Sequence, residues 1–188
     1  KPRLEHIGAT LSVDVTEPDG SDTWSLCFDR NVIGDVSDYI IFMAYDQFGR
    51  YSKVPGSTAS HNWVEKNIKK FINQEGVEPN KIILGVPLYT RLWKTDSSNE
   101  TTNTTVAIKN QYKYIPSDDK VQWLEDAKQN YVQYQKNGDT YKMWIENEKS
   151  ISYKLDLIEK YNLSGAAFWE KGYENEEIWN LVNEKLFE

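Results

Sequence analysis

Four short apolar segments recur along the chain, separated by segments whose apolar residues repeat every three or four positions. Residues 7–15, 39–45, 81–89 and 164–169 are rich in apolar, β-branched and aromatic side chains, which predicts four strands. Segment 39–45 is almost continuously apolar, as are strands buried on both faces of a parallel sheet. Pro87 must lie near the C-terminal end of its strand, because proline cannot donate a hydrogen bond within a central ladder.

Helical spacing of apolar residues predicts the elements between and after these strands. Residues 60–74 carry one apolar face, which predicts a helix. Residues 150–161 form a second predicted helix with Ser150 as its N-cap, and residues 176–186 form a third. A short helix is expected near residues 32–36. The alternation of strand and helix predicts an α/β fold, with a parallel sheet and helices packed outside it.

Residues 94–143 interrupt this alternation. The polar stretch 94–105 is rich in Ser, Thr, Asn and Asp and is expected to be an exposed loop. Asn137 and Gly138 stand between two stretches of strand character, which predicts a β-hairpin. Residues 120–130 fit either a helix or a strand. We therefore expect a small α+β insertion between the third and fourth predicted strands.

The charge and the cysteine content exclude several classes of function. The net charge is −7, from 22 basic and 29 acidic side chains, and no basic cluster is longer than Lys69-Lys70, so no nucleic-acid partner is expected. No apolar run reaches the roughly 18 residues of a membrane span. The single Cys27 excludes an internal disulfide and a cysteine-based zinc site. His6 and His61 are isolated and the acidic pairs lack ligand spacing, so no metal or other cofactor is expected.

Aromatic residues make up 13% of the chain, with seven Trp and twelve Tyr. Aromatic faces fill large cores, but they also form platforms on which the C–H groups of sugar rings pack. Composition alone does not decide between a core and a sugar-binding surface.

Three of the predicted strands end in residues that resemble one enzyme family. Residues 43–46 read Met-Ala-Tyr-Asp, residues 85–91 read Gly-Val-Pro-Leu-Tyr-Thr-Arg, and residues 165–169 read Gly-Ala-Ala-Phe-Trp. In this order they resemble the sixth, seventh and eighth strands of the family-18 glycoside hydrolases, the chitinase-like (β/α)8 barrels. Many members have Gly where Thr90 stands. Residues 144–147, Trp-Ile-Glu-Asn, resemble the bacterial branch associated with cell walls and spores, which often has Asp in place of the Asn.

The resemblance implies the C-terminal half of a TIM barrel, about strands five to eight, with the insertion between the last two strands. Residues 1–93 and 144–188 would form the partial barrel, and residues 94–143 the insertion. In such barrels the functional side chains lie at the C-terminal ends of the strands. The site implied in this way contains Met43, Tyr45, Asp46, Tyr89, Arg91, Glu146 and Trp169.

The same resemblance implies a retaining, substrate-assisted hydrolysis of β-1,4-linked glycans. The N-acetyl oxygen of the sugar attacks its own anomeric carbon, and a glutamic acid protonates the leaving oxygen. Tyr45 would donate its hydroxyl to the acetamido group, and Asp46 would accept hydrogen bonds from sugar hydroxyls or orient the loop of Tyr45. Tyr89 and Arg91 would line the neighbouring subsite.

For three of these residues a purely structural role stays open. Trp169 would form the floor under the distorted sugar, or it would be a core tryptophan under the final helix. Met43 would pack beneath the acetamide, or it would be an ordinary core residue. Glu146 would reach the cleft, or it would be an exposed loop carboxylate.

The catalytic motif of the family, Asp-x-x-Asp-x-Asp-x-Glu on the fourth barrel strand, is absent from this sequence. A full barrel needs about 250 residues, so we expect a fragment whose general acid lies upstream of Lys1. The fragment alone is expected to be inactive. It is also expected to pair with the missing half barrel or to form a homodimer, because a half barrel exposes sheet edges. The resemblance implies an extracellular protein associated with the cell wall or the spore.

Three functions are compatible with these residues. The first is a glycosidase acting on an N-acetylglucosamine-containing polysaccharide, either chitin or peptidoglycan. The second is a non-catalytic carbohydrate-binding protein of the same family, which the last residue of the upstream motif would distinguish. The third is an α/β domain whose aromatic residues only fill a core.

Overall fold

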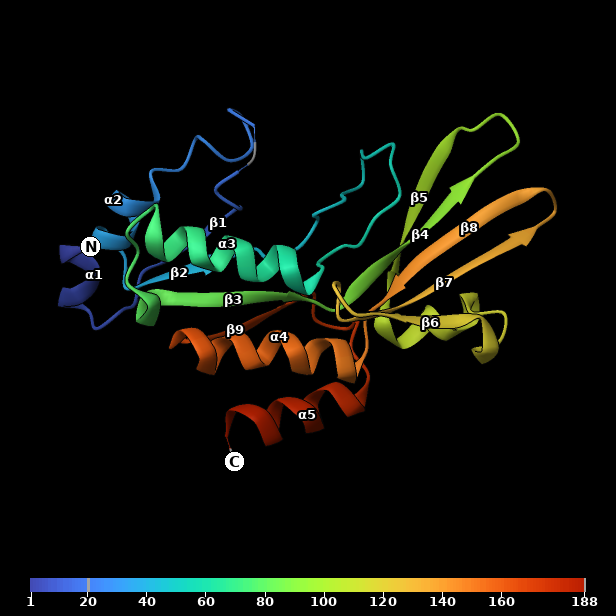
Figure 1. The fold of residues 1–188 in the computed structure, drawn as a ribbon. Helices are drawn as coiled ribbons and strands as arrows, with labels where there is room; N and C mark the ends of the chain where they lie inside the picture. The colour runs from blue at the N-terminus through green and yellow to red at the C-terminus, as the bar shows by residue number, and fades with distance from the viewer. Residues whose placement is uncertain (20, 188) are drawn as a thin grey trace.

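The computed structural model describes residues 1–19 and 21–187, which form two β-sheets (Figure 1). In the first sheet four parallel strands lie in the order β1, β2, β3, β9. Each lies within one of the four apolar segments, so the four predicted strands are confirmed. Their bounds are Ser12–Val15 for β1, Tyr39–Phe42 for β2, Ile82–Pro87 for β3 and Gly165–Trp169 for β9.

Helices pack against this sheet (Figure 1). α3 (His61–Asn73) and α4 (Glu148–Tyr161) contact each other, and α5 (Glu176–Leu186) packs on α4. α2 (Arg30–Val36) contacts β2, and α1 (Pro2–His6) is a short helix near the N-terminus. The predicted helices, including the short one before β2, are thus confirmed. None of the helices in the described part of the chain is both long and apolar enough to cross a membrane.

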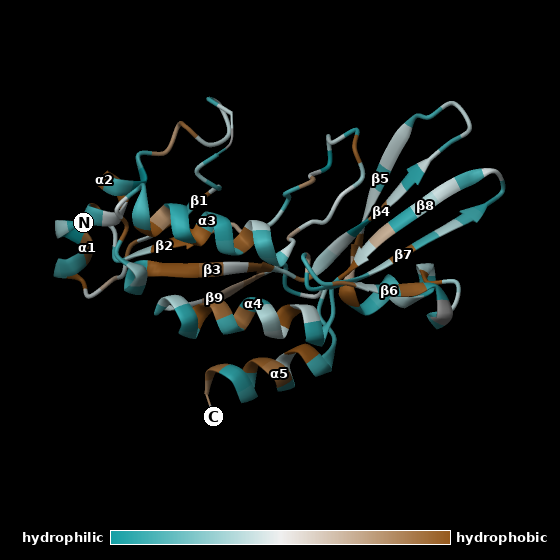
Figure 2. Ribbon diagram, viewed as in Figure 1, coloured by the Kyte–Doolittle hydropathy of each residue, from teal (hydrophilic) through white to brown (hydrophobic). Residues whose placement is uncertain are grey.

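Burial alternates along β2 and the first residues of β3, as expected where helices cover one face of the sheet. Ile40 and Phe42 of β2 and Leu84 of β3 are fully buried, and the Phe42 ring centre lies 4.8 Å from that of Phe71 on α3. Ile41, which points to the opposite face, is partly exposed. Figure 2 shows β3 as mainly hydrophobic and the helices around it as mixed, as expected for an apolar sheet covered by amphipathic helices.

The second sheet is antiparallel and extends away from the helices (Figure 1). Its strands lie in the order β5, β4, β8, β7, β6. Their bounds are Tyr89–Thr95 for β4, Thr101–Ala107 for β5, Val121–Leu124 for β6, Gln129–Lys136 for β7 and Asp139–Ile145 for β8. The described residues also form the 3-10 helices η1 (Pro79–Lys81) before β3, and η2 (Ile108–Tyr114) and η3 (Asp118–Lys120) between β5 and β6.

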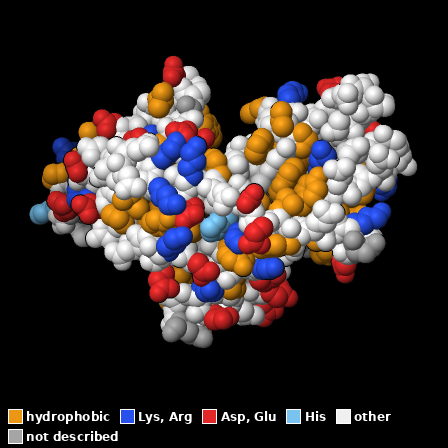
Figure 3. All heavy atoms as spheres, viewed as in Figure 1, with side chains coloured by type: hydrophobic (Ala, Val, Ile, Leu, Met, Phe, Trp, Pro, Cys, Tyr) orange, Lys and Arg blue, Asp and Glu red, His pale blue; other side chains and the backbone are white. Residues whose placement is uncertain are grey.

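The second sheet has a small core of its own and a separate aromatic surface. The core residues are Leu92, Val106, Val132, Met143 and Ile145. On the other side of the strands, Tyr131 of β7 and Trp144 of β8 are cross-strand neighbours with ring centres 4.8 Å apart. Figure 3 shows hydrophobic side chains gathered over this sheet. Part of the aromatic excess of the sequence therefore belongs to the second sheet.

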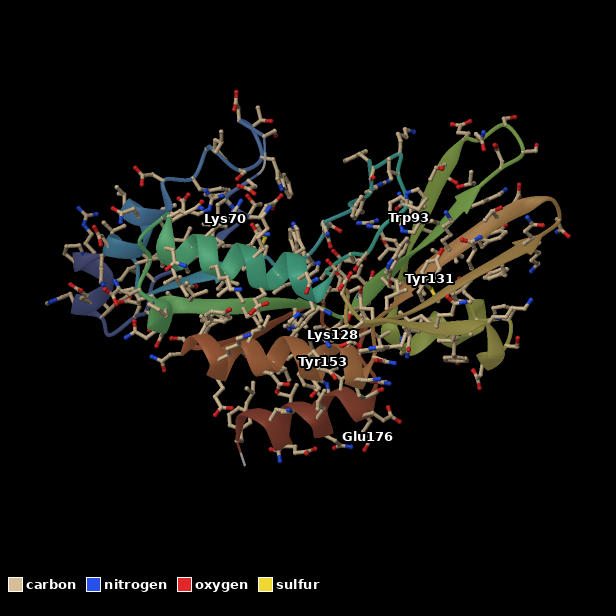
Figure 4. The ribbon with its side chains drawn as sticks, viewed as in Figure 1. Lys70, Trp93, Lys128, Tyr131, Tyr153 and Glu176 are labelled. Carbon is tan, nitrogen blue, oxygen red and sulfur yellow. The ribbon has the colours of Figure 1, made fainter. Side chains whose placement is uncertain are left out.

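Aromatic and cation–π contacts attach the second sheet to α4. Figure 4 shows Lys128 and Tyr153 close together, and the Lys128 amine lies 5.0 Å from the centre of the Tyr153 ring. The ring of Trp123 on β6 lies 5.9 Å from that of Tyr153, and the Lys149 amine lies 3.6 Å above Trp123. Because α4 supplies Lys149 and Tyr153, these contacts fix the position of β6 against the helix.

Three predictions about the insertion are decided by the strand pairing. Only residues 96–100 of the predicted loop 94–105 form a loop. The residues on either side belong to β4 and β5, which pair along their whole length, from Tyr89 opposite Ala107 to Thr95 opposite Thr101. The threonine-rich sequence of β5 suits a strand, because β-branched residues fit a pleated surface. Residues 120–130 contain β6, which decides for the strand, and the predicted hairpin at Asn137-Gly138 is confirmed between β7 and β8.

Two element boundaries also differ from the predictions. Residues 7–11 precede β1 instead of forming its first half. Asn147, and not Ser150, is the N-cap of α4: its side chain accepts a hydrogen bond from the Ser150 amide, and the Ser150 hydroxyl accepts one from the Asn147 amide. This reciprocal pair is a capping box, in which the residue three positions into the helix satisfies the cap residue in return.

Gly85 marks a close approach of β3 to the end of β2. A methyl group at this position would lie 2.5 Å from the Phe42 carbonyl oxygen and 3.2 Å from the Met43 Cα. Both are backbone atoms and cannot move aside without distorting the sheet.

We expect Gly85→Ala to lower the free energy of unfolding of the full-length protein by about 2 kcal/mol, as measured by urea denaturation. Gly34→Ala on α2 is the control, because its methyl group would meet only side chains at 3.6 Å or more; an equal loss there would contradict the explanation.

Candidate functional site

The C-terminal ends of three parallel strands bring most of the sequence-predicted site residues together. Tyr45 and Asp46 follow β2, Tyr89 and Arg91 follow β3 as the start of β4, and Trp169 ends β9. Asp46 adopts a left-handed backbone conformation with φ of 60°. This conformation turns the chain out of the sheet immediately after Tyr45.

Asp46 links the two sheets through its carboxylate. Its Oδ1 atom accepts a hydrogen bond of 2.8 Å from the Tyr89 hydroxyl and one of 2.7 Å from Nη2 of Arg91. Arg91 is only 5% exposed, so this ion pair is shielded from solvent on the arginine side. Burial, together with the nearby Asp46 carboxylate, raises the pKa of Tyr89 above its usual range.

Arg91 is held from its other side by β5. Its Nη1 atom donates to Oδ1 of Asn103 at 3.0 Å and to Oγ1 of Thr105 at 3.3 Å. Thr105 lies directly opposite Arg91 in the ladder, and Asn103 lies two residues further along the same face. Because both terminal nitrogens of the guanidinium are hydrogen-bonded in this way, Arg91 holds the Asp46 carboxylate in one orientation.

Tyr45 and Trp169 line a hollow of about 130 Å³ on the face of the first sheet that the helices leave uncovered. We call it the first hollow, and its lining also includes Asp14 and Gly85. Burial, with the nearby Asp14 and Asp46 carboxylates, raises the pKa of Tyr45 to about 12. The Tyr45 hydroxyl therefore keeps its proton at neutral pH and can donate a hydrogen bond.

A second hollow of about 220 Å³ adjoins the first, because Trp169 lines both. Its lining includes Asp46, Tyr89, Arg91, Thr105, Trp169 and Tyr173. Trp169 is 54% exposed, so its ring is not a core residue under the final helix. The two hollows together place an aromatic face beside a hydroxyl donor and a carboxylate acceptor, which is the set of groups that a sugar ring requires.

Glu146 does not belong to this group, contrary to both interpretations of its sequence position. The side chain is fully buried, and both of its oxygens lie 2.9 Å from the amine of Lys154 on α4. The side chains of Gln129 and Ser150 donate further hydrogen bonds to the same carboxylate. Glu146 is therefore neither in the cleft nor in an exposed loop, and its partners make it a structural residue.

Met43, the remaining sequence-predicted site residue, is partly buried and lies at neither hollow.

Three residues that were not predicted from the sequence line the hollows: Asp14 lies at the first hollow, and Thr105 and Tyr173 lie at the second. The signal for Asp14 was present in the sequence. It is an acidic residue between Val13 and Val15, and in a strand that alternation directs it to the face opposite to its neighbours.

Residues 5–174 match the profile of the family described as glycosyl hydrolases family 18. The chain is 27% identical over 182 residues to the uncharacterized glycosylase YvbX of Bacillus subtilis (strain 168), covering 95% of this chain and 51% of the relative. The chain thus spans about half the length of that relative.

Two solved structures share the fold of the chain. A chitinase from Chromobacterium violaceum superimposes with a TM-score of 0.86 at 22% identity, covering 100% of this chain and 58% of that protein. The spore cortex-lytic enzyme SleL of Bacillus megaterium superimposes with a TM-score of 0.81 at 22% identity, covering 100% of this chain and 43% of that enzyme. In both cases the whole of this chain corresponds to only a part of the larger structure.

Proposed function

The chain belongs to glycosyl hydrolases family 18, and on this premise we propose that the full-length protein is a glycosidase. Its proposed substrates are β-1,4-linked glycans that contain N-acetylglucosamine, either chitin or peptidoglycan. Its proposed mechanism is the retaining, substrate-assisted hydrolysis implied by the sequence resemblance. The observation that carries the proposal is the arrangement of Tyr45, Asp46 and Trp169 around two adjoining hollows at the ends of parallel strands.

In this proposal residues 1–93 and 144–188 form the C-terminal half of a (β/α)8 barrel, and residues 94–143 form the insertion. The parallel order of the first sheet, with helices on one face, supports the division. The second sheet begins at Tyr89 and ends at Ile145, so it extends a few residues beyond the insertion at each end. The acid that protonates the leaving group is proposed to lie outside this chain, and the chain alone is proposed to be inactive.

Each residue of the site has a role that its environment supports. Tyr45 is proposed to donate its hydroxyl to the acetamido group and hold it in position for attack. Asp46 uses only Oδ1 for Tyr89 and Arg91, so Oδ2 is available to a sugar hydroxyl. Trp169 is proposed to form the floor of the sugar site, and Tyr89 with Arg91 the wall of the neighbouring subsite.

The uncovered face of the first sheet supports a proposal about assembly. Asp14 is exposed and Ile41 is partly exposed on this face, although both lie in the middle of their strands. We expect the remaining half of the barrel to cover them, and an isolated chain to pair with a second copy instead.

We also propose that the full-length protein is extracellular and associated with the cell wall or the spore, which the likeness to a spore cortex-lytic enzyme supports.

Trp169→Ala in the full-length protein tests the proposed site. We expect the affinity for a chito-oligosaccharide to fall about ten-fold, because the sugar loses its aromatic floor. Isothermal titration calorimetry measures the change. Trp179→Ala is the control, since Trp179 is 43% exposed on α5, on the helical side of the sheet. Equal affinity of the Trp169 variant and the native protein would refute the proposed site.

A turnover assay beside these binding measurements separates the enzyme from a non-catalytic carbohydrate-binding protein. The sugar-binding groups described above lie within this chain, whereas the family's acid motif does not. Binding that depends on Trp169, without turnover of chitin or peptidoglycan by the full-length protein, would establish the binding function instead.

A further inference from the structure

A third hollow, of about 320 Å³, continues the series formed by the first two. Its lining consists of Arg50, Arg91, Asn103, Thr104 and Thr105, without an acidic side chain. It shares Arg91 and Thr105 with the second hollow, and the second shares Trp169 with the first. The three hollows therefore form a track that leads from the uncovered face of the first sheet to the β4–β5 hairpin.

The wall between the second and third hollows is rigid. Arg91 donates to Asp46 on one side and to Asn103 and Thr105 on the other. Asn103 also donates from Nδ2 to the backbone carbonyl of Arg50 at 3.0 Å. The loop that carries Arg50 is thereby tied to β5, and the lining of the third hollow is already in place in the free protein.

The charges in the third hollow do not cancel. The guanidinium of Arg91 is paired with Asp46. Arg50 is exposed and has no ion-pair partner within residues 1–19 and 21–187; its guanidinium lies 6.0 Å from the centre of the Tyr51 ring. The hollow thus presents one unpaired guanidinium beside the hydroxyl of Thr105, which lies on the same face of β5 as Asn103, and these donors suit a carboxylate.

We propose that the third hollow is a further sugar subsite that accepts a carboxylate-bearing sugar, with Arg50 as the residue that recognises the carboxylate. The proposal rests on the proposed function, and it decides between the two substrates that the proposed function leaves open. Chitin is uncharged along its length, whereas the N-acetylmuramic acid residues of peptidoglycan carry a free lactyl carboxylate wherever the stem peptide has been removed. In this proposal the sugar in the second hollow contacts Trp169, and the next sugar along the track enters the third hollow beside Arg50.

The test compares two ligands on two variants of the full-length protein. The ligands are a peptide-free oligosaccharide of alternating N-acetylglucosamine and N-acetylmuramic acid, and the same oligosaccharide with its carboxylates reduced to alcohols. The variants are Arg50→Gln and, as a matched control, Lys53→Gln, an exposed cation in the same loop. Because both side chains are exposed, both variants are expected to fold normally, and circular dichroism checks this.

Arg50→Gln is expected to weaken binding of the carboxylate ligand about five-fold and to leave binding of the reduced ligand unchanged. Lys53→Gln is expected to change neither. The preference of the native protein for the carboxylate ligand should shrink as salt is added, because the guanidinium is exposed.

Equal binding of the two ligands by the native protein, or an equal loss of both in Arg50→Gln, would overturn the subsite. These outcomes differ from a failure of the proposed function. If the proposed function fails, the native protein binds neither of the two oligosaccharides and no uncharged chito-oligosaccharide. Trp169→Ala then has no measurable affinity to lower.

Discussion

Replacing Tyr45 by phenylalanine is expected to lower kcat of the full-length protein on a chito-oligosaccharide by about 100-fold, with little change in KM. The substitution removes one hydroxyl and leaves the ring, which packs edge-on against Tyr89 at 6.3 Å. The hydroxyl matters most in the transition state, when the bond to the leaving oxygen breaks, positive charge develops on the anomeric carbon and the acetamido oxygen must be held for attack. Steady-state kinetics measure the effect.

Tyr39→Phe is the control for this experiment, because Tyr39 begins β2, at the end away from Tyr45, and is 37% exposed. It should leave both kinetic constants unchanged. A Tyr45→Phe enzyme with native kcat would remove Tyr45 from the mechanism. A rise in KM alone would show that the hydroxyl binds the ground state and the transition state equally.

Lys154→Met is expected to lower the free energy of unfolding of the full-length protein by about 3–5 kcal/mol, the range for breaking a buried ion pair. Lys154 and Glu146 are 1% and 0% exposed, and the variant leaves the carboxylate buried without its cation. Urea denaturation measures the loss. Replacing both residues, as in Lys154→Met with Glu146→Leu, is expected to recover most of it, because no charge is then left buried.

The surface pair of Lys160 and Glu65 supplies the comparison. Their separation of 2.7 Å is similar, but the Lys160 side chain is 58% exposed. Lys160→Met is therefore expected to cost far less stability than Lys154→Met, since the Tyr161 hydroxyl and the Lys69 amine still contact the Glu65 carboxylate. Similar losses for the two lysine variants would show that burial does not set the cost.

The sequence predicted the parts of the fold that depend on local pattern. The apolar runs around Ile40 and Leu84 identified two strands because both are buried in a covered sheet face, and helical spacing identified α3 and α5. The hairpin of β4 and β5 was missed because its threonines are polar by composition, and only their pairing partners make them a strand.

The site residues divide in the same way. Tyr45, Asp46 and Trp169 were found because their short motifs end strands, and parallel strands end at one edge of the sheet. Glu146 was misplaced because its burial depends on how separate elements meet: Gln129 comes from another strand, and Lys154 reaches it from two turns into α4. No pattern of residues around position 146 reveals such a network before the chain is folded.

The connections between the two sheets are short. Only Leu88 separates β3 from β4, and only two residues separate β8 from α4. No flexible linker therefore joins the second sheet to the first sheet and α4. Because Glu146 is also buried between β8 and α4, we expect the two sheets to keep a fixed relative orientation. A ligand then meets Asp46 and Arg91 already paired. The conformational entropy of bringing them together is lost when the chain folds, and it does not weaken each binding event.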